Sequence, residues 1–169
     1  MLRYISLRER FLAAIFLSAL LGGILRVVHV QPRINEGLWR TDDYEYFEMG
    51  RLIREEGYLG DPHRSWRPTA MRMPMYPAFL ALTQAVFGSV PGARRAQILL
   101  GVLAVLLAGA VGWRLHSPAA GALAAFLLAV DPRQIEITHW LFIESFFGFT
   151  LLFLAWALGR WSREESPEW

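Results

Sequence analysis

The stretch FLAAIFLSALLGGILRVVHV, residues 11–30, is an almost unbroken run of apolar side chains. A soluble domain does not need about twenty consecutive apolar positions, a length that matches a hydrocarbon core about 30 Å thick. We therefore predict a transmembrane helix over 11–30. Arg26 and His29 fall near its far end, from which their side chains can snorkel to the lipid headgroups.

The residues before this run predict its orientation. Arg3, Arg8 and Arg10 precede it, and basic residues that flank a first helix tend to stay in the cytoplasm. The run is too long for a cleaved signal core, and no small-x-small cleavage site follows it cleanly, so we interpret it as a retained signal anchor. The chain is expected to be an integral membrane protein with a cytoplasmic N-terminus.

Three further apolar runs complete the expected architecture. We predict transmembrane helices over 96–115, 118–130 and 140–158, followed by a cytoplasmic tail over 159–169. The run 118–130 is short, so it needs a thinned bilayer or partner helices to cross, and the tail changes sides if it does not cross. The expected fold is one all-α membrane domain, residues 1–169, with about four transmembrane helices.

The segment 31–95 is polar and interrupted by prolines, so we predict a long external loop. Asp42 followed by Glu45 matches an acidic capping box, and Gly57 supplies a stop, so we predict a helix over 42–56. The apolar segment 75–87 spans only about thirteen residues, which at about 1.5 Å per residue is too short to cross. The segment 42–56 is expected to be an interfacial helix that lays its apolar face on the membrane, and 75–87 is expected to be another interfacial or a half-buried helix.

The composition narrows the classes of function. The formal net charge is only +2, so the chain offers no large basic surface to nucleic acid. All 17 basic residues are arginine, which suits phosphate or anionic lipid, although genomic base composition explains the bias equally well. The absence of cysteine excludes disulfides, thiolate catalysis and Cys-based zinc sites. His139 with Glu136 or Glu144 is a weak metal set, and we assign no cofactor while leaving a divalent metal open.

On this topology, carboxylates, arginines and aromatic rings collect on the outer side. Asp42 and Asp43 follow the first helix, and Glu144 lies inside the last apolar run, where an ionised group should face a partner or an aqueous cavity. A site for a lipid-linked anion needs this mixture: arginine for phosphate, a carboxylate to take a proton, and aromatic faces for sugar or isoprenoid. The structural alternative is that the two aspartates only cap a helix.

The order of these features resembles the N-terminal part of the GT-C membrane glycosyltransferases, in particular the protein mannosyltransferase and lipid A aminoarabinose transferase type. In that pattern, a loop aspartate precedes an aromatic and a small residue, then arginine with a Pro-Tyr-Pro-like element, Phe-Gly, and an arginine that opens the next helix. The matching residues here are Asp42, Tyr46, Gly50, Arg72, Pro74, Tyr76, Pro77, Phe87, Gly88 and Arg94 or Arg95. The segment DPRQIEITHWLFIESFF, residues 131–147, resembles the later helix break that precedes a glutamate.

The resemblance implies an inverting transferase that takes a sugar from a polyprenyl-phosphate lipid in the bacterial inner (plasma) membrane. It makes Asp42 the general base, although the spacing leaves Asp43 open, and it gives Glu144 a supporting role. It also implies a substrate-binding set in which arginines hold the donor phosphate and tyrosines contact the substrate. That set is Tyr46, Arg72, Tyr76, Arg94 and Arg95.

Members of the GT-C family, which the chain resembles, have several hundred residues, whereas this chain has 169. We therefore expect either a truncated or split transferase that needs another membrane subunit, or a non-catalytic GT-C-derived subunit of a larger complex. A small transporter is a weaker third interpretation, because only Glu144 places a charge within a confident span beyond those explained by the interface.

Overall fold

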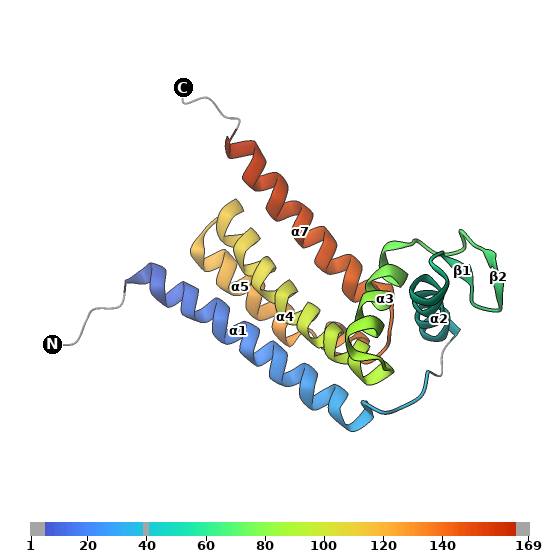
Figure 1. The fold of residues 1–169 in the computed structure, drawn as a ribbon. Coiled ribbons are helices and arrows are strands. Elements are labelled where there is room, and N and C mark those ends of the chain that lie inside the picture. The colour runs from blue at the N-terminus through green and yellow to red at the C-terminus, as the bar shows by residue number, and fades with distance from the viewer. Residues whose placement is uncertain (1–5, 39–40, 165–169) are drawn as a thin grey trace.

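The computed structural model describes residues 6–38 and 41–164, which are mostly helical (Figure 1). The elements in chain order are α1 (Leu7–Val30), the 3-10 helix η1 (Gln31–Arg33), α2 (Thr41–Glu56), β1 (Gly60–Asp61), β2 (Arg64–Pro68), α3 (Met75–Phe87), α4 (Val90–Leu115), α5 (Pro118–Val130), α6 (Pro132–Ile137) and α7 (Ile143–Glu164). The antiparallel β1–β2 ribbon and the short α6 were not predicted from the sequence.

Three helical segments are long and apolar enough to cross a membrane, judged by length and composition: Leu7–Arg33, Val90–Leu115 and Ile143–Trp161. Their outward surfaces fit this role, because large side chains such as Phe16, Leu17 and Leu20 of α1 are exposed. Such an apolar exterior suits lipid rather than water. The protein is therefore a helical membrane protein by its composition and surface.

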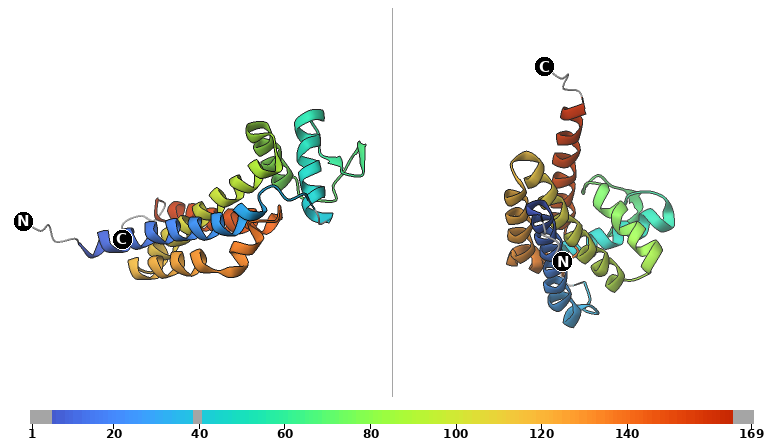
Figure 2. Two further views of the ribbon diagram at one scale, coloured as in Figure 1. Left: turned by 90° about the horizontal axis from the view of Figure 1, so that it is seen from below. Right: turned by 90° about the vertical axis from the view of Figure 1, so that its left-hand side faces the viewer.

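The shorter α5 returns the chain along α1 and α4 (Figures 1 and 2). Glycines allow the close approach of α4 and α5, since a Cβ on Gly121 would lie 2.5 Å from the Gly109 carbonyl oxygen. Asp131 then ends α5 and caps α6, accepting from the backbone N–H of Arg133 at 2.9 Å. The chain after α6 is back at the N-terminal end of α4, because Arg94 near the start of α4 donates to the His139 carbonyl at 3.1 Å.

The elements of the predicted loop gather at one end of the bundle, beyond the C-terminal end of α1 and the N-terminal ends of α4 and α7 (Figures 1 and 2). The prediction of a helix over 75–87 matches α3, and the prediction over 42–56 differs from α2 by one residue. Gly57 and Gly88 adopt positive φ values of 77° and 68°. Only glycine adopts such angles without strain, so these positions end both helices.

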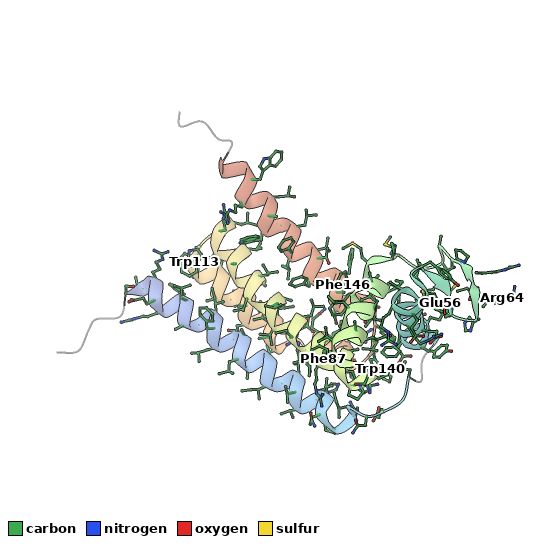
Figure 3. The ribbon with its side chains drawn as sticks, in the orientation of Figure 1. Glu56, Arg64, Phe87, Trp113, Trp140 and Phe146 are labelled. Atoms are coloured by element: carbon green, nitrogen blue, oxygen red, sulfur yellow. The ribbon has the colours of Figure 1, made fainter. Side chains whose placement is uncertain are left out.

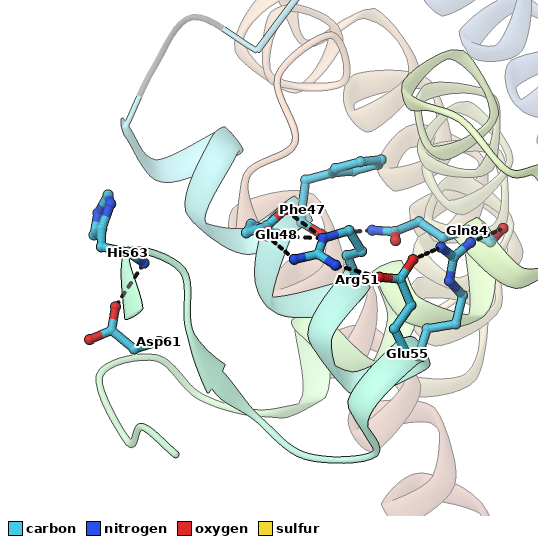
Figure 4. Close-up of polar contacts among 8 residues, drawn as sticks. Phe47, Glu48, Arg51, Glu55, Asp61, His63 and Gln84 are labelled. Carbon is cyan, nitrogen blue, oxygen red and sulfur yellow. Dashed lines mark hydrogen bonds and ion pairs between the residues drawn. The ribbon is translucent and has the colours of Figure 1, made fainter. Parts of the chain in front are cut away.

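Packing between α2 and α3 replaces the expected contact of α2 with the membrane. A Cβ on Gly50 would lie 3.0 Å from the backbone N of Ala81 and from Cβ of Leu80. The amide of Gln84 donates to the Phe47 carbonyl at 2.7 Å, and Arg54 donates to the Gln84 carbonyl at 3.4 Å (Figure 4). The prediction that the apolar face of α2 lies on the membrane is wrong, because that face packs against α3.

Several predicted helix boundaries also need correction. The first helix begins at Leu7 rather than at 11, because Ser6 and Glu9 form a capping box. The helix predicted over 96–115 begins at Val90, where the hydroxyl of Ser89 caps it. The helix predicted over 140–158 begins at Ile143 and ends at Glu164, so it includes the first residues of the tail predicted over 159–169. The last two shifts move arginines into α4 and place Glu144 in the first turn of α7.

The snorkelling interpretation of Arg26 is also wrong. Its side chain is 2% exposed, and it donates to the carbonyls of Gly22 at 3.0 Å and Ala129 at 3.4 Å. The last carbonyls of α5 carry the negative end of a helix dipole, which attracts a guanidinium. Arg26 therefore ties α1 to α5 from inside the bundle.

Candidate functional site

The two adjacent aspartates at the start of α2 have different surroundings. Side chains at neighbouring helical positions point about 100° apart. The side chain of Asp42 is 52% exposed, whereas Asp43 is fully buried and accepts the Tyr44 backbone N–H at 2.8 Å. Asp42 is therefore the carboxylate that a substrate can reach, and Asp43 belongs to the wall behind it.

Arg72 links Asp42 to a second acid on the same helical face. Its Nη2 forms an ion pair with Asp42 and also donates to Oε2 of Glu45 at 2.7 Å, while Nε donates to the same oxygen at 3.2 Å. The hydrogen bonds that Arg72 donates to Glu45, reinforced by the charge of Asp42, raise the pKa of Arg72. Arg72 thus reaches α2 from the segment that precedes α3.

The predicted capping box of Asp42 and Glu45 does not form, and Glu45 belongs to the cluster around Arg72 instead. It is 6% exposed and is directed at Arg72 and at Nε2 of His63, which lies 3.4 Å away. Because α2 begins at Thr41, Glu45 does not occupy the third helical position that a cap at Asp42 requires. Sequence reasoning missed Glu45 and His63 as members of the cluster. The available signal was the i,i+3 spacing of Asp42 and Glu45, which places both acids on one face.

Aromatic rings line the inner side of this cluster. The guanidinium carbon of Arg72 lies 5.1 Å from the ring centroid of Tyr46, and the rings of Tyr46 and Tyr76 meet edge to face at 5.0 Å. Tyr76 in turn contacts Phe79 and Phe146, with centroids 6.0 and 5.8 Å away. Figure 3 shows Phe146 near the start of α7, so α7 supplies part of this wall.

Glu144 lies at the same end of the molecule as Asp42. Burial raises the pKa of Tyr46, and the charges of Asp42 and Glu144 raise it further, while Arg72 opposes them. Burial likewise raises the pKa of Tyr76, with smaller contributions from Tyr46, Glu144 and Asp43. The acids of α2 and α7 therefore act on the same pair of phenol rings.

Glu144 is exposed on the chain, so the expectation that it faces a partner or an aqueous cavity stays a prediction. Since α7 begins at Ile143, Glu144 occupies the first helical turn. A carboxylate is favourable there, because the N-terminus of a helix carries positive partial charge.

Arg94 and Arg95 differ as sharply as the two aspartates. Arg94 is fully buried and donates to five carbonyls, those of Arg33, Ile34, Glu36, Gly37 and His139, at 2.6 to 3.4 Å. Arg95 is exposed. The structure brings neither side chain to Arg72 by any contact among the described residues, and Arg94 instead holds the segment after α1 against the turn before α7.

The weak metal set of His139 with Glu136 or Glu144 does not assemble. His139 is 1% exposed, and its Nε2 lies 3.2 Å from Oε2 of Glu36. Burial, and then the charge of Arg94, lower the pKa of His139, while Glu36 opposes them. Within residues 6–38 and 41–164, no group of three or more His, Asp or Glu side chains has an arrangement that could hold a metal ion.

The assembled cluster is an open surface site. Asp42 offers an accessible carboxylate and Arg72 offers a fixed guanidinium. Tyr46 and Tyr76 are buried, at 5% and 0% exposed, so they form the core behind these groups next to the start of α7 rather than a surface that a ligand contacts. Such groups can bind an amphiphilic anion and can take a proton from an acceptor. Comparisons with protein-family models, with curated proteins and with solved structures give no match.

Proposed function

We propose that the chain is a GT-C-like membrane module that transfers a sugar from a polyprenyl-phosphate donor to an acceptor at the α2 end of its bundle. In this arrangement α1, α4, α5 and α7 all cross, and both termini face the cytoplasm. The observation that carries the proposal is the ion-paired cluster of Asp42, Arg72 and Glu45 beside the ring of Tyr46.

Arg72 is the group suited to the donor phosphate. Glu45 holds its Nε and Nη2, and no residue in the described ranges hydrogen-bonds its Nη1. A guanidinium binds phosphate oxygens with two parallel donors. We infer that Arg72 exchanges the Asp42 carboxylate for phosphate, which leaves Asp42 ready to act as a base.

The exchange gives a balanced single displacement. The acceptor oxygen bonds to the anomeric carbon while the bond from that carbon to the phosphate oxygen breaks. Asp42 takes the acceptor proton, and the phosphate leaves with the bonding electrons beside Arg72. A positioned carboxylate of this kind contributes about 10²- to 10⁴-fold to the rate.

A partner membrane subunit completes the proposal. With half of the Asp42 side chain exposed, the cluster needs a cover, because transfer to an acceptor competes with hydrolysis unless water is excluded. The apolar stretch of α7 has no buried residue, and α7 packs mainly along α4. The uncovered surface of α7 reaches the candidate site at Glu144 and is available to a second chain.

The same two observations favour one alternative, a non-catalytic subunit. Arg72 forms ion pairs with Asp42 and Glu45 in the absence of any ligand. In the alternative, the only role of the cluster is to hold α2 to the segment before α3. In that case α7 docks on a larger complex, and loss of the Asp42 charge has no chemical consequence.

The test is transfer by membranes that contain the full chain with its accompanying subunits, supplied with polyprenyl-phosphate-linked mannose or aminoarabinose. Asp42→Asn should lower transfer about 100-fold or more without lowering the amount of chain in the membrane. Glu56→Gln, an exposed acid at the other end of α2, is the control and should keep full activity. Full transfer by Asp42→Asn would refute the mechanism, and no transfer by any preparation would favour the alternative.

A further inference from the structure

A second amphiphilic cavity lies at the opposite end of the bundle from Asp42. It has a volume of about 580 Å³ and is open between α1, α4 and α7 where α5 begins. Its basic lining residues are Arg8, Arg114 and His116, and its aromatic residues are Trp113, which Figure 3 labels at this end, and Trp156. The proposed transferase site uses none of these side chains.

The cavity changes from polar to apolar along the helix axes. On α1, Arg8 is followed one turn later by Leu12 and then by Ile15. On α4, Arg114 lies at the rim, and Ala110 and Leu106 lie successively deeper. Charge at the water boundary with hydrocarbon below it is the order of groups in a phospholipid.

An apolar groove continues from this cavity between α4 and α7. It shares Leu106, Ala110 and Trp156 with the cavity and extends to Leu103 and Phe149. From Arg114 to Leu103 is eleven residues along α4, or about 16 Å at 1.5 Å per residue. That length is close to half of a hydrocarbon core about 30 Å thick, so the groove fits one acyl chain.

The charge at this end favours an anionic headgroup. Among the described residues that line the cavity, Arg8, Arg114 and His116 are basic and none is a carboxylate. Glu9, next to Arg8 in the sequence, accepts the Ser6 backbone N–H at 2.8 Å in the helix cap. Arg114 is fixed at the cavity, because its Nε donates to the Gly159 carbonyl at 3.0 Å. Basic pockets between helices on the cytoplasmic side bind anionic lipid headgroups.

We propose that this cavity binds an anionic phospholipid, with the phosphate between Arg8 and Arg114 and one acyl chain in the groove between α4 and α7. The lipid fills the space between α1 and α7, which both pack on α4. Binding therefore fixes the direction of α7, and it does not depend on the proposed transferase chemistry.

The test is a titration of the purified full chain with phosphatidylglycerol or phosphatidylcholine, followed by native mass spectrometry. Phosphatidylglycerol should bind at least about tenfold more tightly, and Arg8→Gln should weaken it about fivefold. Arg10→Gln is the matched control. It removes the same charge from α1 two residues after Arg8, at a position that does not line the cavity. Ala110→Phe should block the shared part of cavity and groove and reduce the binding of both lipids.

Thermal unfolding gives a second readout, because a lipid that binds only the folded chain raises its melting temperature. Phosphatidylglycerol should raise it in the wild type and in Arg10→Gln, and less in Arg8→Gln. Equal affinity for the two lipids, or equal effects of the two arginine variants, would overturn the proposal. Displacement of phosphatidylglycerol by millimolar inorganic phosphate would also overturn it, by showing a site for free anions.

Discussion

Replacement of Arg94 by methionine should destabilise the protein strongly, although neither proposal uses this residue in binding. Four of its five hydrogen bonds to carbonyls are 3.1 Å or shorter. Hydrogen bonds from a charged group contribute about 1.5–3 kcal/mol each, or about 6–12 kcal/mol for four. Burial of a guanidinium costs several kcal/mol, so we expect a net loss of about 3–5 kcal/mol. The melting temperature should fall by about 10 °C.

The assay is thermal unfolding of the detergent-solubilised chain followed by tryptophan fluorescence, with amide hydrogen exchange of residues 33–37. Arg94→Lys should recover less than half of the loss, because an ammonium cannot place donors at all of the same carbonyls. Arg95→Met is the matched control, since Arg95 is its exposed neighbour, and should change stability by less than about 0.5 kcal/mol. Equal melting temperatures for the two methionine variants would refute this account of Arg94.

Three further outcomes test other parts of the fold. Gly101→Ala should lower the free energy of unfolding by about 1–3 kcal/mol, because its Cβ would lie 2.5 Å from Nε of Arg26. In a chain that already carries Arg26→Ala, the same substitution should cost much less, as measured by thermal unfolding. Tyr76→Phe should leave stability unchanged or raise it, because the buried hydroxyl has no hydrogen-bond partner in the described chain; a loss above about 1 kcal/mol would reveal a missed acceptor. The lowered pKa of His139 means that the unfolded chain binds the proton more readily, so stability is complete above about pH 6.5 and falls as the pH drops from there toward the folded pKa. His139→Gln should flatten that part of the melting-temperature profile, and an unchanged slope would exclude this residue as its cause.

The helices and their ends were predictable wherever neighbouring residues in the sequence determine them. Apolar runs gave α1, α4, α5 and α7 within a few residues at most ends, and Gly57 and Gly88 gave the ends of α2 and α3. Two caps were readable but missed: Ser6 with Glu9 is a capping box in the printed sequence, and Ser89 directly precedes Val90-Pro91. Recognition of these caps would have corrected the starts of α1 and α4.

The roles of individual arginines were not predictable, because they depend on contacts between distant segments. Arg94 and Arg95 are neighbours of the same type, yet one is buried among carbonyls from residues 33–37 and the other is exposed. Likewise Arg72 meets Asp42 and Glu45 across 30 and 27 residues. Helical spacing put the two acids on one face, but only the packing of α2 on α3 brings Arg72 to them.

The most direct measurement of the central claim is binding of polyprenyl phosphate, compared with the uncharged polyprenol, by the full chain in nanodiscs. The account predicts at least about tenfold tighter binding of the phosphate, given by the donors of Arg72. Arg72→Gln should abolish that preference, while Asp42→Asn should keep or strengthen it, because it removes the carboxylate that competes for Arg72. Arg64→Gln is the control, since Arg64 points outward from β2 (Figure 3). Equal binding of the two lipids, or an equal effect of the two arginine variants, would contradict the account.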